Sequence, residues 1–110
     1  IVSAKRTPMG GFMGGLSTLN ACELGASAIT AALEEAGQDK PVIDEVIMGC
    51  VLPAGLGQAP ARQASIKAGL PLASGAITLN KVCGSGMKAV MLAHDLIKSG
   101  SAKSIIAGGM

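Results

Sequence analysis

Short apolar runs, separated by stretches rich in glycine and proline, divide the chain into alternating segments of strand and helix character. Four runs have the length and the β-branched content of strands, at residues 1–5, 45–51, 76–79 and 103–107. Residues 45–51 are almost continuously apolar, which is typical of a strand covered on both faces of a sheet. The first strand is expected to end before Pro8, because proline has no backbone N–H to donate to a neighbouring strand.

The first predicted helix covers residues 20–36. Asn20 and Glu23 have the three-residue spacing of a capping box, in which each side chain accepts a hydrogen bond from the other residue's backbone N–H. Gly37 follows the last helical position, and glycine readily takes the left-handed conformation that ends many helices. Residues 38–41 are expected to form a polar turn that leads into the next strand.

Two further helices are predicted at residues 61–68 and 86–98. Pro60 suits the first position of the earlier one, because its missing N–H would be unpaired there in any residue. The resulting order is β-α-β-α-β-α-β. Alternation of this kind with short connections predicts an α/β layered domain with a mostly parallel sheet.

Composition excludes several classes of protein. Of the 110 residues, 49% are hydrophobic and 15% are charged, and 9 basic against 7 acidic residues give a net charge of +2. An average soluble domain carries about 25% charged residues, so this chain is too apolar to be disordered by composition. The weak charge and the single Phe argue against nucleic-acid binding, which needs a basic surface and stacking rings. No purely apolar window reaches about 18 residues, so no membrane span is expected.

The cysteines and the chain ends indicate the setting of the protein. Cys22, Cys50 and Cys83 form neither a disulfide framework nor a CxxC metal site, so we expect no metal and a reducing compartment. The chain starts at Ile1 without a signal-peptide layout and ends at Met110 directly after an apolar run. We therefore expect a piece of a longer protein, in the cytoplasm, or in mitochondria if a longer N-terminus exists.

One cysteine stands where a strand meets a helix. The expected strand at 76–79 leads to Asn80, and Cys83 follows at the join, beside the small residues Gly84, Ser85 and Gly86. A helix N-terminus offers unpaired N–H groups and a positive partial charge, which favour a thiolate over a thiol and can stabilise an oxyanion. These features predict a covalent nucleophile at Cys83. The alternative interpretation is a small buried cysteine kept for packing.

A second alternative is dinucleotide binding. Gly84, Gly86 and Ala89 match the G-x-G-x-x-A pattern after a strand and at the start of a helix. That fingerprint expects an acidic residue about 20 positions further on. No Asp or Glu follows Asp95, so this nucleotide-binding α/β module without catalysis is disfavoured.

Asn80-x-x-Cys83-Gly84-Ser85-Gly86 resembles the active-site segment of the thiolases, in particular of those that are acetyl-CoA acetyltransferases. Four other stretches resemble thiolase segments in the same order, at residues 4–16, 44–49, 57–63 and 107–110. The resemblance implies a layered thiolase-like fold. It also implies that residues 1–110 form part of the N-terminal domain, with the end of that domain and the C-terminal half beyond Met110.

The resemblance implies acyl transfer between coenzyme A thioesters. Cys83 would accept the acyl group, with its backbone N–H facing the oxyanion and with Asn80, Gly84, Ser85 and Gly86 supporting the turn. A second acetyl-CoA would then attack to give acetoacetyl-CoA, and the reverse reaction would be thiolysis. Acetyl-CoA and other acyl-CoA would be substrates, with no cofactor or metal, no membrane or nucleic-acid partner, and a homo-oligomer (dimer or tetramer). A ketoacyl synthase-like condensing enzyme is the nearest alternative.

The remaining catalytic groups of thiolases, two His and a second Cys, would come from the C-terminal half, so this segment alone is predicted to be inactive. His94 lies 11 residues after Cys83 on the same predicted helix, roughly 16 Å along its axis, which is too far for a hydrogen bond. We interpret His94 as a packing or surface residue, and Cys22 and Cys50 as core residues.

Two further patterns carry predictions. Residues at helical spacing in the last helix predict a core-facing stripe, namely Met87, Val90, Met91, His94 and Ile97. Arg62 and Gln63 follow the start of a helix at Pro60. Their plain interpretation is a solvated helix face, and the resemblance implies contacts of a dimer.

Overall fold

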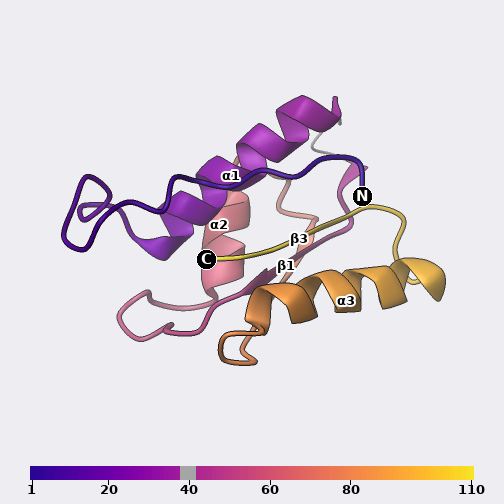
Figure 1. Ribbon diagram of the computed structural model, residues 1–110. Helices are drawn as coiled ribbons and strands as arrows, with labels where there is room; N and C mark the ends of the chain where they lie inside the picture. The colour runs from indigo at the N-terminus through magenta and orange to yellow at the C-terminus, as the bar shows by residue number, and fades with distance from the viewer. Residues whose placement is uncertain (38–41) are drawn as a thin grey trace.

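The structure is a computed structural model that describes residues 1–37 and 42–110. Its elements are three helices and three strands in strict alternation, namely α1 (Ala21–Ala36), β1 (Glu45–Gly49), α2 (Pro60–Lys67), β2 (Gly75–Leu79), α3 (Ser85–Lys98) and β3 (Ile105–Gly109). The strands form one parallel sheet in the order β2-β1-β3 (Figure 1). The predicted α/β class with a parallel sheet is confirmed.

The central strand β1 is buried on both faces, as its continuous apolar run predicts. Val46 and Met48 point into a cluster formed with α1 and α2, while Ile47 points to the opposite face and packs against Ala89 and Ala93 of α3. Because successive side chains of a strand alternate between faces, this pattern gives three layers, with the sheet in the middle.

Local signals place the helix ends well. Asn20 and Glu23 form the predicted capping box, with the Asn20 side chain accepting from the Glu23 N–H at 3.0 Å and the Glu23 carboxylate from the Asn20 N–H at 2.9 Å. Gly37 ends α1 with a left-handed φ of 60°. Pro60 is the first residue of α2, as predicted. The polar turn predicted at 38–41 lies outside the described residues.

The strand predicted at residues 1–5 is wrong. These residues have no regular secondary structure, and they pair with no strand in the described parts of the chain. The segment is attached to α1 instead: the Ser3 hydroxyl donates to the Ala32 carbonyl at 2.8 Å, and Lys5 pairs with Glu35 at 2.6 Å. A hollow of about 780 Å³ separates it from β3, because residues 1–5 and 104–109 both line that hollow. Figure 1 shows the N-terminal segment running along α1.

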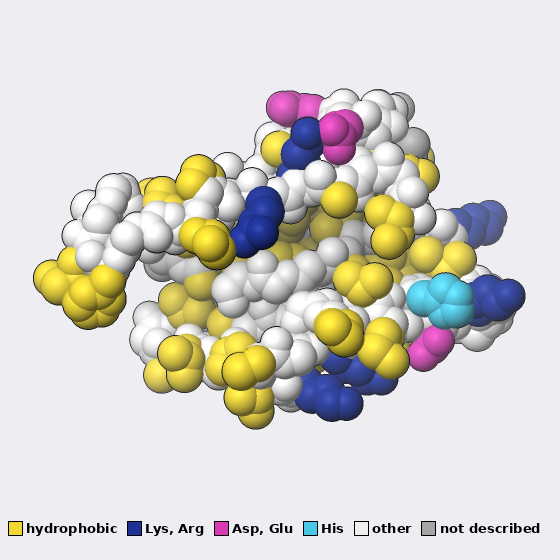
Figure 2. Space-filling view, in the orientation of Figure 1, with side chains coloured by type: hydrophobic (Ala, Val, Ile, Leu, Met, Phe, Trp, Pro, Cys, Tyr) yellow, Lys and Arg dark blue, Asp and Glu magenta, His cyan; other side chains and the backbone are white. Residues whose placement is uncertain are grey.

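The core-facing stripe predicted for α3 is also wrong. Met87 is 73% exposed and Met91 53%, and the other members of the stripe are exposed as well. The buried face of α3 is formed by Ser85, Ala89 and Ala93. Small side chains allow the helix to approach the sheet closely, and the longer side chains then project from the opposite side. Figure 2 shows hydrophobic side chains exposed over this part of the surface.

No helix in the described ranges combines the length and apolar character needed to cross a membrane.

Candidate active site

Cys83 lies in the connection between β2 and α3, and it is the exposed one of the three cysteines. The turn is closed by two backbone hydrogen bonds. The Gly84 N–H donates to the Lys81 carbonyl at 3.1 Å, and the Ser85 N–H donates to the Val82 carbonyl at 3.1 Å. The structure therefore places the Cys83 thiol at the surface, in a short hydrogen-bonded turn at the end of a strand.

Asn80 ties this turn to the neighbouring strand connection. Its side-chain oxygen accepts from the Val82 N–H at 2.8 Å, and its amide nitrogen donates to the Val51 carbonyl at 3.0 Å. The first bond is the local side-chain to backbone contact that asparagine makes in turns. The second joins the turn to the segment that follows β1.

Ser85 holds the turn from the helix side. Its hydroxyl is buried, donates to the Val82 carbonyl at 2.6 Å and accepts from the Lys81 N–H at 2.8 Å. Each of these backbone groups thus gains a partner within the turn. Ser85 is also the first residue of α3, so the same side chain connects the turn to the helix.

The N-terminus of α3 is free of competing side chains. Gly84 occupies the cap position, no side chain makes a capping hydrogen bond, and no acidic residue lies in the first turn. Gly86 follows within that turn, beside Gly109 of β3. The positive end of the helix is thus available to a negative charge that develops near Cys83.

Val82 is a feature of the site that sequence reasoning missed. Its φ of +49° lies in the left-handed region, which β-branched residues avoid. Nothing in the sequence signals it, because valine is the last residue expected in this conformation. Strained backbone of this kind is found at active sites more often than elsewhere.

The other two cysteines belong to the core, as predicted. Cys22 is fully buried and Cys50 is 2% exposed. Burial raises the pKa of the Cys22 thiol, and the nearby Cys50 adds to the rise. Buried structural thiols of this kind are unreactive.

His94 lies on the exposed side of α3, where it lines the larger hollow and contacts the neighbouring Asp95 at 3.3 Å. Its side chain is 70% exposed. Of the two predicted roles, packing or surface, the structure shows the surface one, so His94 is not part of a core-facing stripe. Because α3 starts at Ser85, nine residues before His94, the helix separates it from Cys83 along the axis.

Arg62 and Gln63 are not a solvated helix face. The Arg62 guanidinium donates to the carbonyls of Ser74 at 2.5 Å and Leu72 at 2.8 Å. The Gln63 amide donates to the carbonyls of Leu56 at 2.7 Å and Gln58 at 2.8 Å. The two side chains anchor the loops on either side of α2, a role that the sequence did not reveal.

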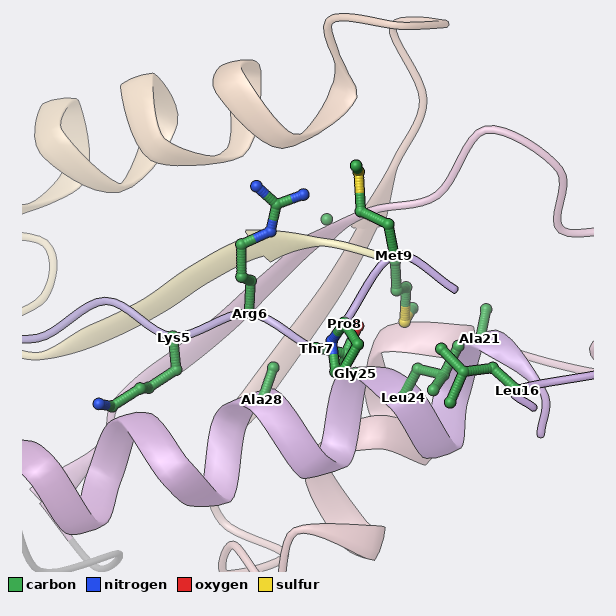
Figure 3. A pocket seen from close by; sticks show the side chains of 12 residues that line it. Lys5, Arg6, Thr7, Pro8, Met9, Leu16, Ala21, Leu24, Gly25 and Ala28 are labelled. Atoms are coloured by element: carbon green, nitrogen blue, oxygen red, sulfur yellow. The ribbon is translucent and has the colours of Figure 1, made fainter. Parts of the chain in front are cut away.

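A second hollow, of about 510 Å³, lies between the N-terminal segment, the start of α1 and the end of β3. Figure 3 shows Lys5 and Arg6 extending from this segment in different directions, with Gly25 and Ala28 of α1 beneath it. Cys83 lines neither hollow. No group of three or more His, Cys, Asp or Glu side chains in the described ranges is placed to hold a metal ion.

Several known proteins are similar to this chain in sequence. Acetyl-CoA acetyltransferase of Cupriavidus necator is 60% identical over 109 residues, which are 99% of this chain and 28% of that protein. The Escherichia coli acetyl-CoA acetyltransferase is 56% identical over 110 residues, 100% of the chain and 28% of the relative. The human mitochondrial acetyl-CoA acetyltransferase is 52% identical over 110 residues, 100% of the chain and 26% of the relative.

A solved structure extends the similarity to three dimensions. The crystal structure of a thiolase from Ascaris suum in complex with coenzyme A has a TM-score of 0.96 and 40% identity, and the match covers 98% of this chain and 28% of that one. The chain thus spans little more than a quarter of the length of these relatives. The family model described as "Thiolase, N-terminal domain" matches residues 1–110. The chain belongs to the thiolase family.

Proposed function

We propose that this chain supplies the acyl-accepting cysteine of an acetyl-CoA acetyltransferase. The observation that carries the proposal is the exposed Cys83 thiol, held by Asn80 and Ser85 in a turn ahead of an uncapped helix N-terminus. An accessible thiol at the positive end of a helix suits nucleophilic attack on a thioester, because that end favours the thiolate and the developing oxyanion.

The proposed reaction has two halves. In the first, the Cys83 thiolate attacks the thioester carbonyl of an acyl-CoA. The oxyanion that forms faces the backbone N–H of Cys83 at the positive end of α3, and its collapse expels the coenzyme A thiolate, which is protonated. In the second half, acetyl-CoA loses an α-proton to a base, and its carbanion attacks the acyl group on Cys83. The Cys83 thiolate leaves and acetoacetyl-CoA is the product; thiolysis is the reverse.

The base and the proton donor of these steps are proposed to come from outside the 110 residues. Within the described part of the chain the buried thiols of Cys22 and Cys50 are unsuited to proton transfer at the surface. His94 lies nine residues after Ser85, the first residue of α3, which is about 14 Å along the helix axis from the turn that contains Cys83. The 110 residues alone are therefore proposed to be inactive. From the resemblance to thiolases, the assembled enzyme is proposed to be a homo-oligomer, a dimer or a tetramer.

Coenzyme A thioesters are the proposed substrates. The Ascaris suum thiolase was solved in complex with coenzyme A, and the most similar relatives are named for acetyl-CoA. No metal or redox cofactor takes part in the proposed steps. Because relatives include bacterial and mitochondrial proteins, either a cytoplasmic or a mitochondrial location is compatible with the proposal.

Replacement of Cys83 tests the proposal. In the protein encoded by the complete reading frame, Cys83→Ala should lower the rate of acetoacetyl-CoA thiolysis by at least about 10³-fold, because no acyl-enzyme can form. Cys50→Ala is the matched control, since it removes a buried thiol, and it should retain activity in the fraction that folds. Wild-type activity in Cys83→Ala would refute the proposal. Activity with acyl-carrier-protein thioesters in place of coenzyme A thioesters would favour a ketoacyl synthase instead.

A further inference from the structure

Gly49, the last residue of β1, lies directly against the first turn of α3. A Cβ atom built on Gly49 would be 2.6 Å from the backbone nitrogen of Gly86 and 2.6 Å from the Cβ of Ser85, and it would overlap the carbonyl carbon of Ser85. Two of these three atoms belong to the backbone, so no side-chain rotation can relieve the contact. Any side chain at position 49 must displace α3 or β1.

A second glycine contact lies beside the first. A Cβ built on Gly109 of β3 would be 3.3 Å from the Cα of Gly86. Gly49 and Gly109 are partners in the parallel register, so both strand ends meet the same turn of the helix. The first turn of α3 therefore lies on the backbone of two neighbouring strands.

This contact is linked to the thiol through Ser85. The Ser85 hydroxyl bonds to both the Lys81 N–H and the Val82 carbonyl, which flank Cys83 on its N-terminal side. A shift of Ser85 consequently moves the whole turn. Because reactivity depends steeply on geometry, a displacement of about 1 Å can cost on the order of 10²-fold in rate.

We infer that Gly49, 34 positions before Cys83 in the sequence, is a positioning residue for the thiol: the absence of a side chain at the end of β1 sets how deeply the first turn of α3 lies on the sheet, and thereby where Cys83 stands. The inference rests on the proposed function of Cys83 as the acyl acceptor. It adds a residue from another strand to the site. Gly109 has the same role through a looser contact.

Gly108 provides a matched control. It lies in the same strand as Gly109, and a Cβ there would be 3.4 Å from the Sδ of Met48, which is the flexible end of a side chain. None of the three glycines has a positive φ, so alanine is free of backbone strain at each position. Alanine at position 49 thus makes a severe contact with the backbone of α3, alanine at 109 makes a mild one, and alanine at 108 makes none.

The test measures the single-turnover rate of Cys83 acetylation at saturating acetyl-CoA in the protein from the complete reading frame. Gly49→Ala should lower this rate about 10- to 100-fold, Gly109→Ala by a smaller factor, and Gly108→Ala by less than about 2-fold. Alkylation of Cys83 by iodoacetamide should stay within about 3-fold in all three, because the thiol remains exposed. A change in folding alone would instead lower the fraction of titratable Cys83 and leave the rate of that fraction unchanged.

Equal acetylation rates in Gly49→Ala and Gly108→Ala would overturn the inference. If Gly49→Ala does not fold, Gly109→Ala decides: a slower rate than in Gly108→Ala supports the inference, and an equal rate overturns it. Failure of the proposed function looks different, because wild-type Cys83 would then be alkylated by iodoacetamide but not acetylated by acetyl-CoA.

Discussion

At the residue scale, the left-handed conformation of Val82 strains the backbone of the turn that contains Cys83. A left-handed backbone costs a β-branched residue about 1–2 kcal/mol, and the 65% exposed side chain regains little by burial. The Asn80 side chain and the Ser85 hydroxyl bond to the Val82 N–H and carbonyl respectively, so both backbone groups of the strained residue are held. The hydrogen bonds of Asn80 and Ser85 therefore hold Val82 in a backbone conformation that valine disfavours.

The first prediction concerns this strain. Val82→Gly should raise the free energy of unfolding by about 0.5–1 kcal/mol, because relief of the left-handed strain outweighs the greater freedom of glycine in the unfolded chain. Urea denaturation of both proteins measures the difference. Val82→Ala, which retains the strained φ, is the control and should show no such gain; a destabilised Val82→Gly variant would show that the turn is not strained.

The role of a residue could be predicted from the sequence where it depends only on that side chain and on the backbone close to it in the chain. Asn20, Glu23 and Gly37 are of this kind, and the structure has them as predicted. The roles of Arg62 and Gln63 could not be predicted in this way, because their hydrogen-bond partners are carbonyls in loops whose position depends on the whole fold. For the same reason, the contact of Gly49 with α3 has no signature in the sequence.

At the element scale, the starts of β1 and β3 are joined by one carboxylate. Asp44, the residue before β1, accepts hydrogen bonds from the N–H groups of Lys103 at 2.7 Å and Ser104 at 3.1 Å. These two bonds lower the pKa of the Asp44 carboxyl, the bond from Lys103 being the larger cause. The interaction stabilises the pairing of β1 with β3 at the N-terminal ends of the strands, the end of the sheet opposite Cys83.

The second prediction follows from the direction of that shift. A lowered pKa in the folded state means that the unfolded state takes up a proton first as the pH falls. The stabilisation by Asp44 is thus fully present above about pH 4–5 and is lost as the pH falls through the folded pKa. The gap in Tm between wild type and Asp44→Asn should be largest near neutral pH and should shrink below about pH 4. A gap independent of pH would contradict this account.

The elements themselves were largely predictable, since apolar periodicity and caps are local. The three described strands, residues 45–49, 75–79 and 105–109, and all three helices lie within a few residues of their predicted ranges. The two wrong predictions, the strand at residues 1–5 and the buried face of α3, both concern contacts between elements. Whether residues 1–5 pair as a strand and which face of α3 is buried depend on what lies beside them, and periodicity does not contain that information.

At the scale of the whole molecule, much apolar surface is left without cover. In the sheet that the structure describes, β2 and β3 are edge strands with one unpaired side each. Met87, Val90 and Met91 of α3 are exposed, as are Ile1 and Val2. Figure 2 shows such side chains around the hollow between the N-terminal segment and α3. Unpaired edges and apolar patches of this kind favour association.

The third prediction is therefore that the 110 residues expressed alone will be poorly soluble or will associate. Size-exclusion chromatography with light scattering measures the mass in solution. Met87→Lys together with Met91→Lys, on the exposed face of α3, should reduce the association because charges replace apolar contact surface. A monodisperse monomer from the unmodified chain would contradict the prediction.

Cys83 is the proposed acyl acceptor, and one measurement tests this role directly. The protein from the complete reading frame is mixed with acetyl-CoA, quenched in acid, digested and analysed by mass spectrometry. We predict one acetyl group on the peptide that contains Cys83 and none on those that contain Cys22 or Cys50, whose thiols are buried. An unmodified Cys83 in protein that is active on acetyl-CoA, or acetyl groups on another residue, would contradict the account.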